Sequence, residues 1–322
     1  MQAILAVTIP FFALVLAGYL AAQRRVLPES AIPGLNAFVL FFALPCLLFR
    51  FGANTPLLEL LNPVVLGVYT ATALLIVFFT VATTLGARVQ LKDAAFGALV
   101  AAFPNTGFMG VPLLVALLGP AAAGPVICTV LADLFVTSSL CIALAQSHEA
   151  SGLGGRAAVL KALRGALSNP LPWAIALGAA SSVSGLRLLG PVDTIVKMLA
   201  DAASPVALFT IGAVLWRAGQ HAHTRTPPAL FVPVALIKLF VHPLAVFALG
   251  AAARALGAPL SPFELLTLTL AAALPSASNV SLLAERYGAD NGRIARIILS
   301  STALAFVSFT LLAWGLGVRA AG

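Results

Sequence analysis

The chain is poor in charged residues. Asp, Glu, Lys and Arg make up 9% of its 322 residues, whereas 61% of the residues are hydrophobic. An average soluble domain carries about 25% charged residues. A surface with so little charge cannot stay dispersed in water, so the composition excludes a soluble globular protein and predicts a membrane protein.

Cysteine is scarce, and so are the residue clusters that metal sites and enzymes need. Cys46, Cys128 and Cys141 all lie in apolar runs, where cysteine is usually a small buried hydrophobic residue. Neither a disulfide nor a metal site is therefore expected. The sequence contains no HExxH pattern, no paired His/Asp cluster and no Ser–His–Asp candidate. A membrane enzyme is thus disfavoured, and we expect no cofactor.

The N-terminus lacks the basic residues that begin a secretory signal. The first apolar run starts directly after Met1, and Arg24 and Arg25 follow it. We therefore expect a first membrane-spanning helix with its N-terminus outside. The net charge of +8 does not indicate a nucleic-acid partner, because Lys and Arg sit between apolar runs rather than on one face.

Apolar runs long enough to span a bilayer, about 20 residues each, fill most of the chain. The longest polar segment, 147–169, reads as a flexible linker that includes a short basic surface helix at 156–167. We predict ten spans, at 2–22, 31–51, 62–86, 94–118, 121–146, 170–189, 194–216, 228–252, 262–284 and 292–316.

The basic residues orient these spans. Cytoplasmic loops of membrane proteins carry an excess of Lys and Arg. With ten spans and an outside N-terminus, twelve of the eighteen basic residues fall inside, five fall outside and Lys238 falls in the membrane. We therefore expect both termini outside. The twelve inside residues are Arg24, Arg25, Arg88, Lys92, Arg156, Lys161, Arg164, Arg217, Arg225, Arg286, Arg293 and Arg296.

The two halves of the chain repeat one another. Pro10 recurs as Pro170, 160 positions later, and the run AAFP that ends at Pro104 recurs as AALP ending at Pro275, 171 positions later. Each half holds five spans, and an odd number forces the halves into opposite orientations, which predicts an inverted repeat. Other repeated positions are Gly18 and Gly178, Pro45 and Pro205, Leu48 and Leu208, and Phe49 and Phe209.

The fourth and ninth spans are expected to be broken helices. Pro104 and Pro275 cannot donate a backbone hydrogen bond, and freed backbone groups in a membrane are tolerated only where they are buried in protein or line a wet cavity. Matching breaks in two halves indicate the binding site of a secondary transporter. The candidate substrate-binding residues are Pro104, Asn105, Thr106, Gly107, Pro275, Ser276, Ser278 and Asn279.

Such a crossing should attract an anion. Each break exposes the N-terminal end of a half-helix, with free N–H groups and a partial positive charge. Two of these ends facing one cavity favour a carboxylate. Asn105 and Asn279 follow the breaks and can donate and accept hydrogen bonds, so they suit carboxylate oxygens or a coupling ion.

Charged residues at mid-membrane depth are the second group of candidates. Asp133 lies at the centre of the fifth span, and Lys238 lies near the centre of the eighth, with His242 one turn later. Buried ionisable residues in membranes usually serve a function, so we predict that Asp133 and Lys238 share one polar cavity next to the crossing. Lys238 could also stand in for a sodium ion, and His242 could simply cap backbone beside Pro243. Asp201, in an ion-pair ladder near the outer boundary, is a secondary candidate for coupling.

Three runs carry a family resemblance. FPNTGFMGVPLL in the fourth span, LPSASNVSLLAERYG in the ninth and LPCLLF in the second closely resemble the auxin efflux carrier family. The family includes bacterial permeases for malonate and similar anions and the plant PIN auxin exporters. The resemblance covers essentially the whole chain. The segment 147–169 is much shorter than the central loop of many plant members, which argues against assuming auxin as the substrate.

The resemblance implies an all-α fold like that of bile-acid sodium symporters and NhaA-type antiporters. In that fold helices 4 and 9 cross at their prolines, helices 3–5 and 8–10 form a moving transport domain, and helices 1, 2, 6 and 7 form a scaffold that often dimerises. The expected domains are a first repeat at 1–146, a cytoplasmic linker at 147–169 and a second repeat at 170–322.

The leading hypothesis is a secondary transporter of small organic anions in a bacterial inner membrane, working by elevator-type alternating access. Proton coupling is possible, a homodimer is expected, and both termini would be periplasmic. The alternative is a cation/proton antiporter or a sodium-coupled symporter on the same fold. An antiporter usually needs two adjacent midplane carboxylates, and only Asp133 is found at that depth.

Overall fold

The computed structural model describes residues 1–322 except 57–59, 147–166, 222–225 and 319–322. The described residues form helices throughout, and pair as β-structure only in two isolated bridges. Most of the predicted linker 147–169, including its basic residues, lies outside the described part of the chain. The predicted all-α fold class is confirmed.

The first half consists of helices with several local irregularities. In chain order they are α1 (Gln2–Gln23), α2 (Ile32–Phe38), a π-helical turn (Val39–Ala43), α3 (Leu44–Asn54), α5 (Pro63–Thr84), α6 (Leu91–Ala102), a π-helical turn (Thr106–Gly110), α7 (Val111–Leu118), α8 (Ala123–Ala132), a π-helical turn (Asp133–Thr137) and α9 (Ser138–Gln146). Short 3₁₀ turns, Glu29–Ala31 and Pro120–Ala122, precede α2 and α8.

The second half begins after the linker. It contains α11 (Pro170–Ser184), α12 (Gly190–His221), α13 (Pro228–Leu236), a π-helical turn (Ile237–Val241), α14 (His242–Ala255), α15 (Pro262–Ala272), α16 (Val280–Arg286) and α17 (Asn291–Gly315).

Among the described residues, seven helical segments are long and apolar enough to cross a bilayer. The fourth and ninth predicted spans are interrupted instead, as α6–α7 and α15–α16, with the shorter apolar helices Thr106–Leu118 and Pro262–Ala272 beside the breaks. The sixth predicted span is the 15-residue α11. The protein is therefore a multi-pass membrane protein, and its helices break where the prolines predict.

Side chains fix several helix starts. The carboxamide oxygen of Asn62 accepts from the backbone N–H groups of Val64 and Val65, at 3.0 and 3.3 Å, and so caps α5. Ser261 and Glu264 form a reciprocal capping box at the start of α15. The amide of Asn62 also donates to Glu264 at 2.8 Å, so the starts of α5 and α15 are joined at one end of the molecule.

Two helix crossings are close enough to require glycine. A Cβ atom at Gly18 of α1 would lie 1.8 Å from the carbonyl oxygen of Phe209 in α12. A Cβ atom at Gly178 of α11 would lie 2.3 Å from the carbonyl oxygen of Phe49 in α3. Small residues allow membrane helices to approach this closely. Helices α1 and α12, and α11 and α3, are thus locked as tight pairs.

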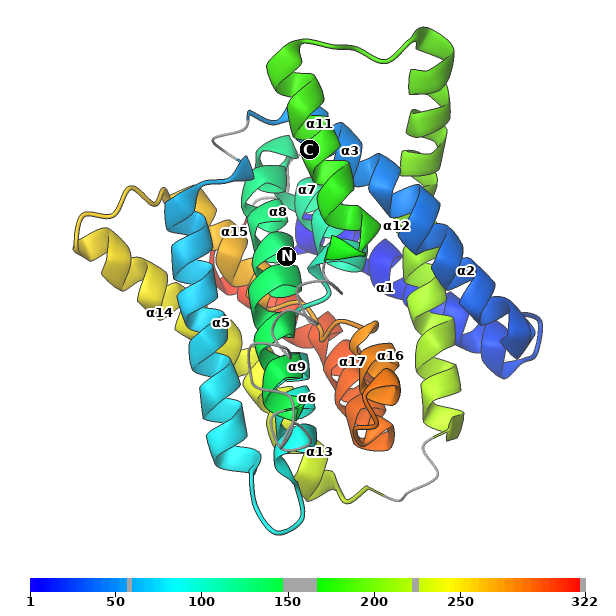
Figure 1. Cartoon of the computed structure of the whole chain (residues 1–322), viewed down its shortest axis with the longest axis vertical. Coiled ribbons are helices and arrows are strands. Elements are labelled where there is room, and N and C mark those ends of the chain that lie inside the picture. The colour runs from blue at the N-terminus through cyan, green and yellow to red at the C-terminus, as the bar shows by residue number, and fades with distance from the viewer. Residues whose placement is uncertain (57–59, 147–166, 222–225, 319–322) are drawn as a thin grey trace.

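The helices gather into two groups (Figure 1). Helices α1, α2, α3, α11 and α12 pack on one another, whereas α5 packs on α6 and α14, α14 on α15, and α13 on α17. The turn Thr106–Gly110 and α17 contact α12 across the boundary between the groups. We name the first group the frame and the second group, α5–α9 with α13–α17, the core group.

Candidate functional site

The two breaks cross and are hydrogen-bonded to each other. The backbone N–H of Asn105 donates to the carbonyl of Pro275 at 2.8 Å, and the N–H of Ala277 donates to the carbonyl of Phe103 at 3.0 Å. Pro104 and Ser276 thereby face each other as an isolated antiparallel bridge. Each interrupted helix thus satisfies backbone groups that the other one frees, as burial in a membrane protein requires.

Side chains satisfy further freed groups. The Ser276 hydroxyl donates to the carbonyl of Val100 in α6 at 2.8 Å, and the Ser276 backbone N–H donates to the Ser301 hydroxyl of α17 at 3.2 Å. The backbone N–H of Thr106 turns back to the carbonyl of Pro104 at 2.8 Å. The crossing is therefore fixed to α6 and α17.

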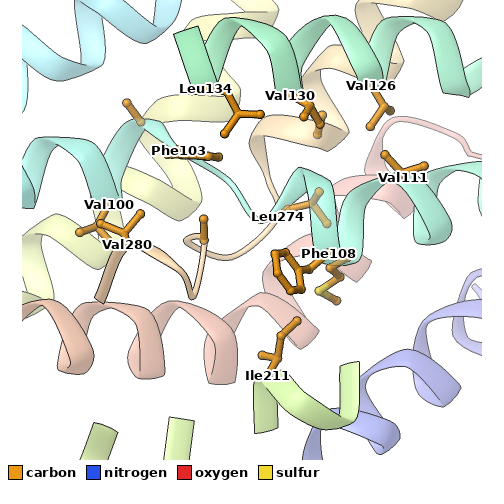
Figure 2. Packing of buried hydrophobic residues seen from close by; sticks show 14 of the residues in the cluster. Val100, Phe103, Phe108, Val111, Val126, Val130, Leu134, Ile211, Leu274 and Val280 are labelled. Atoms are coloured by element: carbon orange, nitrogen blue, oxygen red, sulfur yellow. The ribbon is translucent and has the colours of Figure 1, made fainter. Parts of the chain in front are cut away.

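Apolar side chains surround the crossing. Figure 2 shows Leu274 and Phe108 beside it, with Val130 of α8 on one side and Ile211 of α12 on the other. All of these residues belong to the largest cluster of buried hydrophobic residues, in which Leu274 has 0% exposure. An apolar wall excludes water and strengthens the polar interactions inside it. The crossing therefore lies in a dry, apolar part of the core.

A cavity of about 460 Å³ opens beside the ninth-span break. It lies between α2 and the end of α12 from the frame and the segment 278–285 and Asn291 from the core group. Glu29 and Glu285 at its mouth are exposed, whereas Ser278 and Ser281 deeper in it are 7% and 6% exposed. The lining residues are Glu29, Pro33, Asn36, Ala37, Leu40, Phe41, Val214, Arg217, Ser278, Asn279, Ser281, Glu285 and Asn291.

The predicted substrate residues divide between the crossing and this cavity. Ser278 and Asn279 line the cavity. Gly107 is the one partly exposed residue between 101 and 110, and a Cβ atom placed there would meet nothing within 4 Å. The other five are buried in the crossing itself: Pro104, Asn105, Thr106, Pro275 and Ser276.

Two amide groups in the cavity have unused hydrogen-bonding capacity. The Oδ1 atoms of Asn279 and Asn291 are buried and have no hydrogen-bond partner. The oxygen and nitrogen of an amide exchange places when the side chain rotates, so each group can offer either N–H donors or an acceptor to a ligand. The inner part of the cavity can therefore hold a polar ligand by neutral groups.

Asp133 lies in a second polar region, away from this cavity. It is fully buried; Tyr69 of α5 donates to its Oδ2 atom at 2.9 Å, and the Thr137 hydroxyl donates to Oδ1 at 3.1 Å. It begins the π-helical turn in the fifth span, and such turns are frequent at functional sites. The Ser138 hydroxyl donates to the backbone carbonyl of Asp133 at 2.8 Å.

Lys238 and His242 form the other part of this region. Both side chains have 0% exposure. The Lys238 Nζ atom donates to the carbonyl of Ala272, the last residue of α15, at 2.5 Å and lies 3.3 Å from Nδ1 of His242. The His242 and Tyr69 ring centroids are 6.0 Å apart. Asp133, Tyr69, His242 and Lys238 thus form a continuous chain of contacts, named here the buried polar chain.

Asp133 and Lys238, which are predicted to share one polar cavity, do not contact each other directly. Among the ion pairs of the described residues, none joins these two side chains within 4.0 Å. Tyr69 and His242 lie between them in the chain of contacts. Lys238, like Asp133, lies within a π-helical turn, Ile237–Val241.

Asp201 is not part of the buried polar chain and lies in a different environment. It accepts from Lys197 at 2.6 Å, and both side chains are exposed. It lines a cavity of about 370 Å³ with Arg50 and Pro120, whereas Lys238 and Asp133 are buried in the core group. The structure therefore does not bring Asp201 together with the other charge candidates.

Three residues of the 460 Å³ cavity and the buried polar chain were not predicted from the sequence. Asn36 and Asn291 line the 460 Å³ cavity, and Tyr69 bonds Asp133. Tyr69 was detectable in principle, because it is one of only three tyrosines and stands within an apolar span. Asn36 and Asn291 carry no such signal: Asn291 is the first residue of α17, where asparagine is common, and Asn36 is a single neutral residue within the second predicted span.

Crossed, proline-broken helices beside a polar cavity in a multi-pass membrane protein define a membrane transporter. The family model described as "Membrane transport protein" matches residues 3–313, so the chain belongs to this family, that of the auxin efflux carriers, as its motifs predict. The protein is accordingly a transporter and not an enzyme.

Curated relatives match along almost their whole length. The chain is 29% identical over 315 residues to the "Putative malonate transporter" of Rhizobium meliloti (strain 1021), covering 96% of this chain and 95% of the relative. It is 26% identical over 293 residues to the "Uncharacterized transporter YfdV" of Escherichia coli (strain K12), covering 87% of each. An "Uncharacterized transporter" of Methanothermobacter thermautotrophicus is 27% identical over 304 residues, covering 92% of this chain and 93% of the relative.

Proposed function

We propose that this protein is a secondary transporter of small organic anions that works by alternating access. The observation that carries the proposal is the pair of crossed breaks with a 460 Å³ cavity beside it, and Ser278 and Asn279 line this cavity. Broken helices of this kind place substrates near the middle of the membrane in secondary transporters.

The proposed substrate is a small carboxylate of the malonate kind. The name of the Rhizobium meliloti relative supports this class. The inner cavity offers amide and hydroxyl groups; of its charged lining residues, Glu29 and Glu285 are exposed and Arg217 is half-buried. We propose that neutral hydrogen-bond donors next to the breaks, those of Ser278, Asn279 and the backbone, hold the carboxylate.

The proposed architecture is ten spans in two inverted repeats with both termini periplasmic. The glycine contacts of the frame support it, because they repeat at the 160-residue offset. Gly18 of α1 approaches Phe209, and Gly178, 160 positions after Gly18, approaches Phe49, 160 positions before Phe209. Gly212 and Gly52 are related in the same way: Gly212 approaches Val15, and Gly52 approaches Ile175.

The proposed movement is an elevator-type shift of the core group against the frame. The 460 Å³ cavity lies between the two groups and opens at the end of the molecule that carries Arg217 and Glu285. A smaller cavity of about 370 Å³ lies between α3 and α12 of the frame and Pro120 of the core group. The predicted topology places the end that carries Arg217 in the cytoplasm. The 460 Å³ cavity would then open to the cytoplasm, which corresponds to an inward-facing state.

Proton coupling through Asp133 is proposed as part of the mechanism. Asp133 is the one carboxylate in the buried polar chain, and its neighbours Tyr69 and Thr137 can donate to it. The antiporter alternative requires a second carboxylate, and Asp201 lies in a separate cavity. The homodimer through the first, second, sixth and seventh predicted spans remains a prediction from the family resemblance.

The test is transport by purified protein in proteoliposomes. We expect labelled malonate or a related small carboxylate to accumulate with a rate that saturates, and unlabelled carboxylates to compete. Empty liposomes and liposomes holding the Asn279→Ala variant are the controls. Saturable sodium or proton exchange in the absence of any carboxylate flux would contradict the proposal and favour the antiporter.

A further inference from the structure

The C-terminal ends of the two interrupted helices meet the buried polar chain. Helix α6 ends at Ala102 and α15 ends at Ala272, each directly before a break. The last carbonyl groups of a helix lack partners within the helix and carry a partial negative charge. In transporters with broken helices, such C-terminal ends bind the coupling cation.

In this protein a side-chain cation already contacts one of these ends. Lys238 donates to the carbonyl of Ala272 and contacts Nδ1 of His242. His242, one turn further along, has its ring next to the backbone of Ala101 in α6, and its Nε2 atom completes no hydrogen bond. Ala101 and Ala272 each stand three residues before a break proline, Pro104 and Pro275.

Neighbouring helices supply the counter-charge. The titratable groups that face Lys238 and His242 directly or through Tyr69 are Asp133 of the fifth span and Tyr69 of α5, and Cys141 of α9 lies near Asp133. Asp133 and Lys238 have opposite charges, so the region can be neutral as a whole. This matters because a lone buried ion in a membrane is costly.

We propose that the ammonium group of Lys238 is a tethered cation that replaces a coupling metal ion at the crossing. It bonds the end of α15, positions His242 toward the end of α6, and balances Asp133. The inference rests on the proposed transport function and deepens it: a carboxylate would move without sodium, because the positive charge at the crossing belongs to the protein.

The first test uses the wild-type protein and sodium. Proteoliposomes would take up labelled malonate with sodium chloride, potassium chloride or choline chloride outside, at equal ionic strength. We expect initial rates to agree within about twofold, because an ion with no site cannot shift the transport equilibrium. A rate that rises about tenfold or more with sodium would overturn the inference while leaving anion transport intact.

The second test removes the tethered cation. Lys238→Met keeps the length of the side chain and removes the charge, so we expect malonate uptake to fall by about tenfold or more, since breaking a buried charge cluster leaves its partner uncompensated. Lys197→Met is the matched control, because Lys197 forms an exposed ion pair with Asp201, and it should transport like wild type. Uptake by a folded Lys238→Met variant at the wild-type rate would overturn the inference.

A third measurement does not depend on transport. The thermal unfolding midpoint of wild-type protein in detergent would be compared in sodium chloride and choline chloride at equal ionic strength. An ion that binds only the native state stabilises it by RT ln(1 + c/Kd), where c is the free ion concentration; because we infer that sodium has no site here, we expect equal midpoints. A higher unfolding midpoint in sodium chloride than in choline chloride would overturn the inference that Lys238 replaces a coupling metal ion. If no carboxylate is transported and the midpoints are equal, the proposed function fails while the cation assignment stands.

Discussion

At the scale of single residues, the structure separates roles that looked alike. Asn105 and Asn279 both follow a break proline, yet Asn105 is 3% exposed and its backbone bonds Pro275, whereas Asn279 is partly exposed and lines the 460 Å³ cavity. The cause is the distance from each proline. Asn105 comes one residue after Pro104 and stays inside the crossing, and Asn279 comes four residues after Pro275, where α16 begins.

This difference predicts unequal effects of alanine substitutions. Asn279→Ala should weaken carboxylate binding by about 1–3 kcal/mol, the range for leaving a buried polar group unpaired, whereas Asn105→Ala should affect binding less. Binding would be measured by isothermal titration with malonate in detergent. Asn54→Ala is the control, since Asn54 bonds the Arg50 carbonyl at the opposite cavity. Equal losses in both variants would contradict the assignment.

A second prediction concerns the Asp133 carboxylate. Asp133→Asn keeps the shape of the side chain and the acceptor for the Tyr69 hydroxyl but cannot exchange a proton. We expect the dependence of malonate uptake on pH to flatten in this variant. Asp193→Asn, which alters an exposed ion pair with Arg50, should keep the wild-type profile. A profile unchanged by Asp133→Asn would remove Asp133 from proton coupling.

At the scale of helices, proline and glycine determine the architecture more than hydrophobicity does. Prolines break the fourth and ninth spans, and the backbone groups freed by the breaks pair across the crossing. Glycines let α1 meet α12 and α11 meet α3 without side chains between them. In the frame, helices meet by direct backbone contact at the glycines. In the core group, buried polar side chains such as Asp133 and Lys238 lie between the helices.

The crossings predict the effect of a single methyl group. Gly18→Ala would place its Cβ atom on the Phe209 carbonyl, so α1 and α12 must separate, and we expect a loss of about 1–3 kcal/mol or more from overpacking. Gly178→Ala should act similarly at the α11–α3 crossing. The control is Gly67→Ala in α5, where a Cβ atom meets nothing within 4 Å. Thermal unfolding in detergent would measure the difference; equal midpoints for the Gly18 and Gly67 variants would refute the packing argument.

At the scale of the whole molecule, the two cavities lie at opposite ends and both lie between the frame and the core group. One is lined by Arg217 and Glu285, the other by Arg50 and Asp201. Only one of them reaches Ser278 and Asn279. Access from one side at a time follows if the core group moves past the frame.

Cysteine labelling in intact cells would test this arrangement. On a Cys46→Ser background, a membrane-impermeant maleimide should label Gln2→Cys from the periplasm, because the basic loops favour the cytoplasm. Ser278→Cys should be labelled from the cytoplasm in inverted vesicles and protected by malonate. Cys128 and Cys141 are buried and serve as internal controls. Labelling of residue 2 from the cytoplasmic side would contradict the proposed topology.

The sequence by itself determined the fold class, the transporter family and the two helix breaks. These depend on local properties: apolar run length, the missing N–H of proline and the spacing of repeated motifs. It also identified Asp133, Lys238 and His242, because ionisable residues stand out in apolar spans. These features can be read from the sequence because each depends on which residue stands at which position, and none depends on contacts between helices.

Only the tertiary structure decided which candidates share a site. The roles of Tyr69, Asn36 and Asn291, and the separation of Asp201 from Asp133, depend on contacts between residues far apart in the chain. The bond from Lys238 to the carbonyl of Ala272 joins residues 34 positions apart and involves a backbone atom that every residue possesses. No residue type marks such an acceptor in advance, so only the packing of the helices determines which carbonyl a buried lysine reaches.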